Sequence, residues 1–153
     1  MKSRFDYRLA VESDLPAIVE MLADDELGAG REDFQTPLPQ SYLAAFRKIV
    51  NDENQELTVV ELDGQIAATF HLSFIQYLTY RGGIRAQIEA VRVKSGMRGT
   101  GIGKEVFQYA IQRAKDKGAH LVQLTTDQKR PDALRFYQQL GFVNSHNGMK
   151  LHL

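Results

Sequence analysis

The stretch VRVKSGMRGTGIGKEVF, residues 91–107, contains the strand–loop–helix unit from which the fold can be inferred. An apolar run is followed by three glycines at alternate positions, Gly99, Gly101 and Gly103, and then by a helix-like segment. A glycine-rich turn between a strand and a helix forms an anion site, because free backbone N–H groups and the positive end of the helix dipole point at the ligand. The stretch therefore predicts an anion-binding loop, and a tight turn without a ligand is the alternative interpretation.

Two familiar nucleotide loops do not match this spacing. A mononucleotide P-loop requires a glycine, four further residues and then Gly-Lys-Ser/Thr, but Arg98 stands at the first position and Glu105 follows Lys104. The dinucleotide fingerprint Gly-x-Gly-x-x-Gly fails as well, since its last position is Lys104 or Val106. The pattern that remains after the strand is RGTGIG, residues 98–103.

The rest of the chain combines helix and strand patterns in a mixed order. Hydrophobic periods and turn residues predict strands at residues 5–9, 56–62, 65–78, 84–93 and 120–126, and helices at 15–22, 42–50, 102–118 and 131–140. Residues 142–153 read as a last hairpin that turns at Asn147-Gly148. This order lacks the strict alternation of a doubly wound fold. It predicts a single α/β (α+β) domain over residues 1–153, with a mixed, mostly antiparallel central sheet flanked by about four helices.

The composition narrows the class of protein. Hydrophobic residues make up 43% of the 153 residues and charged residues 25%, which argues against disorder. Nineteen basic residues balance nineteen acidic ones, so no net field draws the chain to nucleic acid or to an anionic membrane. The absence of cysteine excludes disulfides, a thiol nucleophile and thiolate metal sites. A polar N-terminus and the lack of a long apolar run predict a soluble, cytoplasmic protein.

Two motifs resemble those of the GNAT family of N-acetyltransferases. The RGTGIG loop at residues 98–103 resembles the family's pyrophosphate loop, written Arg/Gln-x-x-Gly-x-Gly/Ala. The segment DALRFYQQLGF, residues 132–142, resembles its C-terminal motif, in which Ala, Phe-Tyr and Leu-Gly-Phe recur at this spacing. The order of elements between the two motifs also fits. The chain is therefore identified as a member of this family, on a resemblance that is specific over about half of its length.

The resemblance implies acetyl-coenzyme A (acetyl-CoA) as the donor. In the family, the strand before the loop splays from its neighbour and offers backbone groups to the pantetheine arm, here those of Val91 and Val93. The pyrophosphate is expected to bind the loop, to which the following residues contribute: Arg98, Gly99, Gly101, Ile102, Gly103 and Lys104. The side chain of Lys104 either adds charge or faces solvent. Arg130 stands where many members carry an asparagine that reaches the pantetheine. Arginine has no acceptor oxygen, so the role of that asparagine does not carry over to Arg130. The partner of Arg130 is either a coenzyme phosphate or an anionic substrate.

Acetyl transfer to an amine requires a proton acceptor for the ammonium, a donor for the oxyanion and a proton for the departing thiolate. The resemblance implies that a main-chain N–H polarises the thioester and that Tyr137, which matches the family tyrosine near the sulfur, supplies the last proton. A core aromatic is the alternative for Tyr137. Glu89 interrupts the apolar strand and is the candidate base; the alternative is a strand glutamate paired with Arg85 or Arg92.

The sequence thus predicts transfer of an acetyl group from acetyl-CoA to a primary amine. KRPDALRFY, residues 129–137, followed by Ser145-His146, is similar to aminoalkylphosphonate acetyltransferases, which suggests a small amine that carries an anionic group. A peptide or protein N-terminus and a non-catalytic acyl-CoA-binding module are the alternatives. His71 points either into the acceptor pocket or outward. The acidic run Asp24-Asp25-Glu26 with Glu32-Asp33 either attracts the amine or is a solvated helix end. His146 has no second ligand at metal spacing, so no metal site is expected. Homodimers are common in the family.

Overall fold

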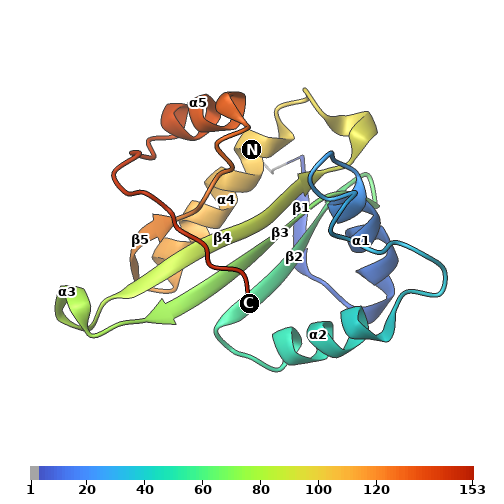
Figure 1. Cartoon of the computed structure of the whole chain (residues 1–153), viewed down its shortest axis with the longest axis horizontal. Helices are drawn as coiled ribbons and strands as arrows, with labels where there is room; N and C mark the ends of the chain where they lie inside the picture. Colours follow the sequence, from blue (N-terminus) through green and yellow to red (C-terminus); the bar gives the residue numbers. More distant parts are fainter. Residues whose placement is uncertain (1–3) are drawn as a thin grey trace. The chain divides into compact units, whose positions relative to one another are not determined.

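The computed structural model describes residues 4–153, which form two compact units, one ending at Gln123 and one from Leu124 to Leu153 (Figure 1). The elements of the first unit are β1 Asp6–Leu9, a 3-10 turn Glu12–Asp14, α1 Leu15–Ala23, α2 Gln40–Val50, β2 Gln55–Leu62, β3 Gln65–Gln76, α3 Thr79–Gly82, β4 Ile84–Val93, a 3-10 turn Ser95–Met97, α4 Ile102–Asp116 and β5 Ala119–Gln123. The second unit contains α5, Pro131–Gln139. No helix within residues 4–153 is both long and apolar enough to cross a membrane.

The five strands form one sheet in the order β1-β2-β3-β4-β5. The first three strand pairs are antiparallel and the pair β4–β5 is parallel. The ladder between β4 and β5 ends at Gln87 and Gln123, although β4 continues to Val93, so the two strands separate beyond this point. The mixed, mostly antiparallel sheet with a splayed strand pair is confirmed.

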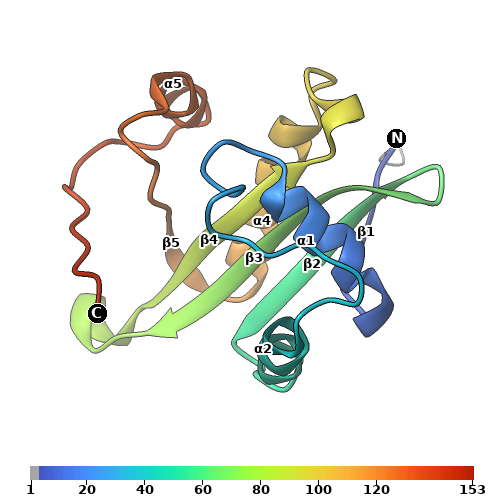
Figure 2. The same ribbon diagram turned by 45° about the vertical axis from the view of Figure 1, so that its right-hand side comes forward.

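Helices cover both faces of the sheet (Figure 2). On one face, Val59 of β2 packs in a core cluster with Leu15 and Ile18 of α1 and Phe46 of α2. On the other face, the ring of Phe70 in β3 meets Tyr109 of α4 edge to face, with 6.1 Å between centroids. Successive residues of a strand point to opposite faces. The face on which α1 and α2 pack is called the α1 face below.

The turn between β2 and β3 follows directly from its sequence. Asp63 and Gly64 both adopt left-handed backbone angles, with φ of 52° and 77°. Two such residues form the tight turn whose twist matches that of the flanking strands, and Asp-Gly is a preferred pair for it. The hairpin predicted at this position is present, and it sets the register in which β2 and β3 align their side chains.

The hairpin predicted for residues 142–153 is wrong. The second unit contains α5 as expected, ended by Gly141 at φ 96°, but residues 142–153 form no strand. Val143, Met149 and Leu151 are exposed. An isolated two-stranded hairpin is marginal in water and requires a covered apolar face or a third strand. Within residues 124–153 there is no strand on which this segment could pack.

Candidate active site

The glycine loop ends in the N-terminus of α4. Gly101 is the cap residue, with φ of 84°, and the N–H groups of Lys104 and Glu105 both donate to its carbonyl at 3.1 and 3.3 Å. The N–H groups of Ile102 and Gly103 precede these first intrahelical hydrogen bonds, as the first donors of any helix do. Gly101 is exposed, and a β-carbon placed on it would have no atom within 4 Å. The loop therefore presents backbone donors and a helix end to open space, which is the arrangement of an anion site.

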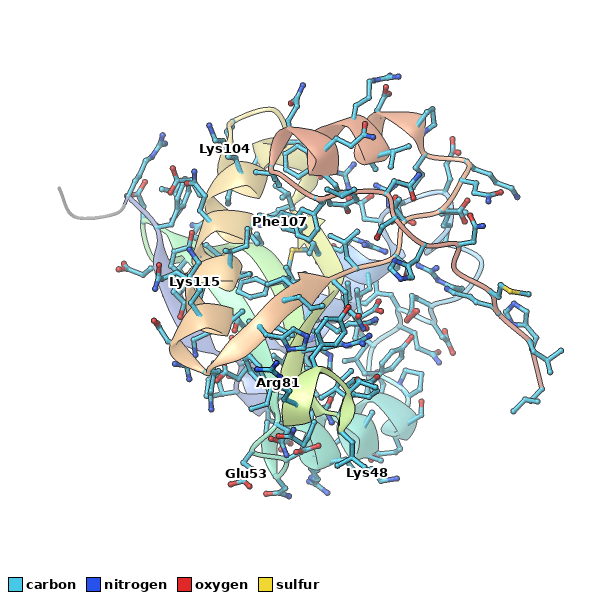
Figure 3. The ribbon with its side chains drawn as sticks, turned by 90° about the vertical axis from the view of Figure 1, so that its left-hand side faces the viewer. Lys48, Glu53, Arg81, Lys104, Phe107 and Lys115 are labelled. Atoms are coloured by element: carbon cyan, nitrogen blue, oxygen red, sulfur yellow. The ribbon has the colours of Figure 1, made fainter. Side chains whose placement is uncertain are left out.

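The basic side chains of the loop point in different directions. Lys104 lies in the first turn of α4 and is exposed, and Figure 3 shows its side chain directed outward from the helix. Arg98 instead reaches toward the segment after α1, where its Nη2 donates to the carbonyl of Asp24 at 2.8 Å and lies 3.4 Å from the Asp24 carboxylate. The anion site is consequently built from main-chain N–H groups, with Lys104 at its margin.

The splayed end of β4 presents a backbone edge. The N–H of Lys94 donates to the carbonyl of Ala67 in β3 at 2.8 Å, and Arg92 is aligned with Thr69 of the same strand. In an antiparallel pair, alternate residues direct their main-chain groups to the same neighbour. Val93 and Val91 therefore direct theirs to the opposite edge, where the ladder with β5 has already ended. This is the edge that was expected to face a pantetheine arm.

Two arginine side chains donate hydrogen bonds to backbone carbonyl groups on this edge. Nη1 of Arg92 donates to the Val91 carbonyl at 2.9 Å, and Nε of Arg98 donates to the Val93 carbonyl at 3.3 Å. The donors that the edge can offer to a bound molecule are thus the N–H groups of Val91 and Val93. An amide-containing arm needs such donors for its carbonyl oxygens.

A β-bulge lies at the same place. The register between β3 and β4 shifts between Thr69 and His71, so that Thr69 is aligned with Arg92 and His71 with Glu89. Ala90, between them, has a φ of 53°. One extra residue in β4 changes the alternation of its side chains. Glu89 and Arg92 consequently lie on the same face of the sheet.

That face is the α1 face. His71 is aligned with Leu57 of β2, which packs against the α1–α2 core cluster, and aligned residues share a face. Arg92 on this face lies 3.0 Å from the carboxylate of Asp25, in the segment after α1. Asp24 and Asp25, considered above as an attractor for a cationic amine, are therefore paired with Arg98 and Arg92.

Glu89 belongs to a hydrogen-bonded series of polar side chains that runs along β4 to Gln87 and then crosses to Gln123 of β5. Its Oε1 accepts a hydrogen bond from Nε2 of Gln87 at 2.7 Å, and Oε1 of Gln87 accepts from Nε2 of Gln123 at 2.8 Å. The two arginines considered as partners of Glu89 are engaged elsewhere. Arg92 pairs with Asp25, and the guanidinium of Arg85 lies over the ring of Tyr77, 4.7 Å from its centroid. Glu89 is an exposed carboxylate on the α1 face, as a base for a bound amine has to be.

His71 is the functional candidate whose direction the sequence left open. It lies beside Glu89 and is partly buried, and its Nε2 is 2.9 Å from Oε1 of Gln55. Burial lowers the pKa of His71 below its ordinary 6.5, and the negative charge of Glu89 opposes that change. The imidazole therefore faces the same side as the candidate base.

Tyr137 lies in the second unit, on α5. Its ring meets Phe136 and Phe142 edge to face, with centroids 5.6 and 6.1 Å away, and it is partly buried. Arg130 is the cap residue of the same helix and is exposed. These contacts fit an aromatic cluster of the second unit, and the role of Tyr137 as an acid stays a prediction.

One family model and several known proteins resemble this chain. Residues 17–142 match the model described as the acetyltransferase (GNAT) family. An aminoalkylphosphonate N-acetyltransferase of Salmonella typhimurium is 30% identical over 107 residues, which are 70% of this chain and 69% of that protein. A crystal structure described as a transcriptional regulator from Bacillus halodurans is 52% identical, with a TM-score of 0.94 over 97% of this chain and 99% of that one. An acetyltransferase from Trypanosoma brucei is 26% identical, with a TM-score of 0.78 and the same coverage, 97% and 99%.

Proposed function

Because the chain belongs to the acetyltransferase (GNAT) family, we propose that it transfers the acetyl group of acetyl-CoA to the primary amine of a small molecule. The observation that carries this proposal is the glycine-capped, exposed N-terminus of α4, which follows directly on the open edge of β4. Together they offer donors for a diphosphate and for an amide-containing arm. A coenzyme A molecule contains both of these groups.

The donor is bound mainly by the main chain. The N–H groups of Ile102 and Gly103 hold the diphosphate at the positive end of the helix, and the N–H groups of Val91 and Val93 hold the arm. Lys104 adds a charge at the rim. Since the amides are fixed by the helix and by the sheet, they require little reorganisation when the coenzyme binds.

The acceptor binds on the α1 face, where Glu89 takes a proton from its ammonium group. The free amine then attacks the thioester carbonyl carbon, and a main-chain N–H on the open edge of β4 donates to the oxyanion that forms. The carbon–sulfur bond breaks, and Tyr137 gives its phenolic proton to the departing thiolate. The proton that the new amide nitrogen loses restores Tyr137, so the two residues act on different protons.

The Salmonella typhimurium relative is named for aminoalkylphosphonates, which makes this class the first acceptor to test. Arg130 is a cation that can pair with a phosphonate or with a coenzyme phosphate. A small amine with an anionic group is therefore preferred here over a peptide N-terminus.

The test is an acceptor screen in which free thiol is measured as it is released from acetyl-CoA. The panel contains aminoalkylphosphonates, the matching amines without the anionic group, amino sugars and short peptides. Amine-dependent thiol release, together with the acetylated product by mass spectrometry, is expected for at least one small amine. Binding of acetyl-CoA without thiol release for any amine would favour the non-catalytic module instead.

A further inference from the structure

A chain of hydrogen bonds fixes the protonation pattern of His71. Nε2 of Gln55 donates to Oδ2 of Asp52 at 2.9 Å, and a carboxylate oxygen can only accept. This sets the amide of Gln55 so that its oxygen, Oε1, faces Nε2 of His71 at 2.9 Å. Because an amide oxygen has no hydrogen, Nε2 of His71 must donate. A neutral His71 therefore carries its hydrogen on Nε2 and its basic lone pair on Nδ1.

The charged groups around His71 leave Glu89 as the dominant one. On the β2 side the imidazole meets the neutral amide of Gln55, and on the β4 side it is aligned with Glu89. Arg92 on the same face is neutralised by Asp25 at 3.0 Å. The ionisable side chains of the helices on this face are Glu20 on α1 and Arg47 and Lys48 on α2, which are exposed, and Tyr42 on α2, which is partly buried and donates to Glu32.

A free imidazole is a stronger base than a free carboxylate, which favours it as the acceptor of a proton that comes from an amine. As free side chains, imidazoles titrate at higher pH than carboxylates, at about 6.5 against about 4.3, and the burial that lowers the pKa of His71 narrows this difference. A neutral imidazole can accept a proton from a neighbouring carboxyl group. Burial lowers the pKa of His71, which keeps the ring neutral and able to accept at neutral pH.

We propose that His71 is a proton-relay residue, which takes the acceptor's proton from Glu89 at Nδ1 and passes it to solvent. This inference rests on the proposed acetyl transfer. In the first step an N–H bond of the ammonium breaks, its electron pair stays on nitrogen, and an O–H bond forms on Glu89. In the second step that O–H bond breaks and Nδ1 gains the hydrogen, which gives an imidazolium and restores the carboxylate. The imidazolium then loses the proton to water, so the pair is ready for the next amine.

The experiment measures kcat/KM between pH 5 and 9 with one amine, for the wild type and for His71→Gln. Glutamine keeps a donor for Gln55 but cannot take up a proton. The acceptor's own ionisation cancels in the ratio of wild type to variant. We expect a ratio of at least about tenfold at neutral pH, which falls toward one as pH drops through the pKa of His71, below 6.5. A ratio that is close to one, or constant over this range, overturns the inference.

Two further variants test the relay even if His71→Gln does not fold. Gln55→Glu places a carboxylate against the Nε2 hydrogen, so it should raise the pKa of His71. The fall of kcat/KM on the acid side of the pH profile should then occur at higher pH than in the wild type. A fall at the same pH as in the wild type contradicts the relay. His120→Gln is the matched control, because His120 is exposed and bonds the Ile84 carbonyl, and its profile should equal that of the wild type. A control that loses the acid limb as well also overturns the assignment to His71.

Nitrogen-15 spectra of the imidazoles test the same idea without turnover. The wild type should show a neutral His71 with the hydrogen on Nε2. The signals of His71 are identified as those missing from the spectrum of His71→Gln. A hydrogen on Nδ1 refutes the relay. The failure of the proposed function looks different: a wild type that releases no thiol with any amine overturns the acetyl transfer itself, and the relay with it.

Discussion

Replacing Gly101 with alanine separates the cost of backbone strain from the loss of anion binding. Gly101 and Gly64 have nearly the same left-handed backbone, with φ of 84° and 77°, and a β-carbon on either would meet no atom within 4 Å. Alanine in this region costs about 1–2 kcal/mol at each position. Both variants should therefore lose a similar amount of stability, roughly 2–8 °C in Tm for a chain of this length.

Only one of the two positions faces the proposed diphosphate. The added methyl group at Gly101 lies among the first N–H groups of α4, whereas Gly64 lies in the turn between β2 and β3. Losing one hydrogen bond to a charged group costs about 1.5–3 kcal/mol, which is about a tenfold to hundredfold rise in Kd. At a coenzyme concentration of about a hundred times the wild-type Kd, bound acetyl-CoA adds about 2.7 kcal/mol to the stability of the wild type. For Gly101→Ala the same concentration should add only about 0.4–1.4 kcal/mol.

The assay is thermal unfolding with and without acetyl-CoA for the wild type and both variants, supported by titration calorimetry for Kd. Without ligand, Gly64→Ala should have a lower Tm than the wild type, and acetyl-CoA should raise its Tm by as much as it raises that of the wild type. Gly101→Ala should have a similarly lowered Tm without ligand, and acetyl-CoA should raise its Tm by less. Equal coenzyme shifts in the two variants would refute the reasoning and leave the glycine loop as a turn.

Three further outcomes are expected. Lys104→Ala should raise the Kd of acetyl-CoA much less than Gly101→Ala, because the main chain supplies most of the anion binding; calorimetry on both gives the comparison. Glu89→Gln should lose turnover that returns as pH rises toward the acceptor's own pKa, whereas Tyr137→Phe should lose about a hundredfold or more without such rescue; matching pH–rate profiles would refute these roles. Asp14→Asn should destabilise the fold near neutral pH. Arg8 lowers the pKa of Asp14 from its ordinary 3.8, so this contribution is present above that value and is lost as pH falls through the lower folded pKa, which urea unfolding at several pH values can follow.

Local patterns predicted what local interactions determine. The glycine spacing at residues 99–103 predicted the cap of α4, and Asp63-Gly64 predicted the turn between β2 and β3, because glycine and aspartate adopt left-handed backbone more readily than most residues do. Asn147-Gly148 carries an equally good turn signal, yet residues 142–153 form no hairpin. A turn signal reports that the backbone can reverse there. It contains no information about whether the strands that it joins will find a covered face.

Long-range pairs had no signal in the sequence. Asp24 lies 74 residues from Arg98, and acidic residues after a helix are as readily solvated as paired. Their pairing is decided by the sheet, which brings the end of β4 beside the segment after α1. Asp24 and Asp25 therefore pair with Arg98 and Arg92 beside the open edge of β4, a pairing that charge patterning alone could not predict.

The direction of His71 was unpredictable for a different reason. Both faces of β3 are covered by helices, and four consecutive residues, 67–70, are buried. A strand that is buried on both sides lacks the alternation of apolar and polar residues from which the direction of each side chain is predicted. Histidine in such a strand could point to either helix layer, and only its alignment with Leu57 and Glu89 assigns it to the α1 face.

The bulge at Ala90 explains why period-two reasoning fails at the site itself. Strict alternation would place Glu89 and Val91 on one face and Arg92 on the other, but the extra residue puts Glu89 and Arg92 together. Ala90 has a φ of 53°, which costs a residue with a β-carbon of order 1–3 kcal/mol. That strain is retained at the one point of β4 where the carboxylate, the arginine that pairs with Asp25 and the open backbone edge meet. A regular strand would turn one of these groups away from the others, so the bulge is the feature of the sheet that brings Glu89 and the open backbone edge of β4 together.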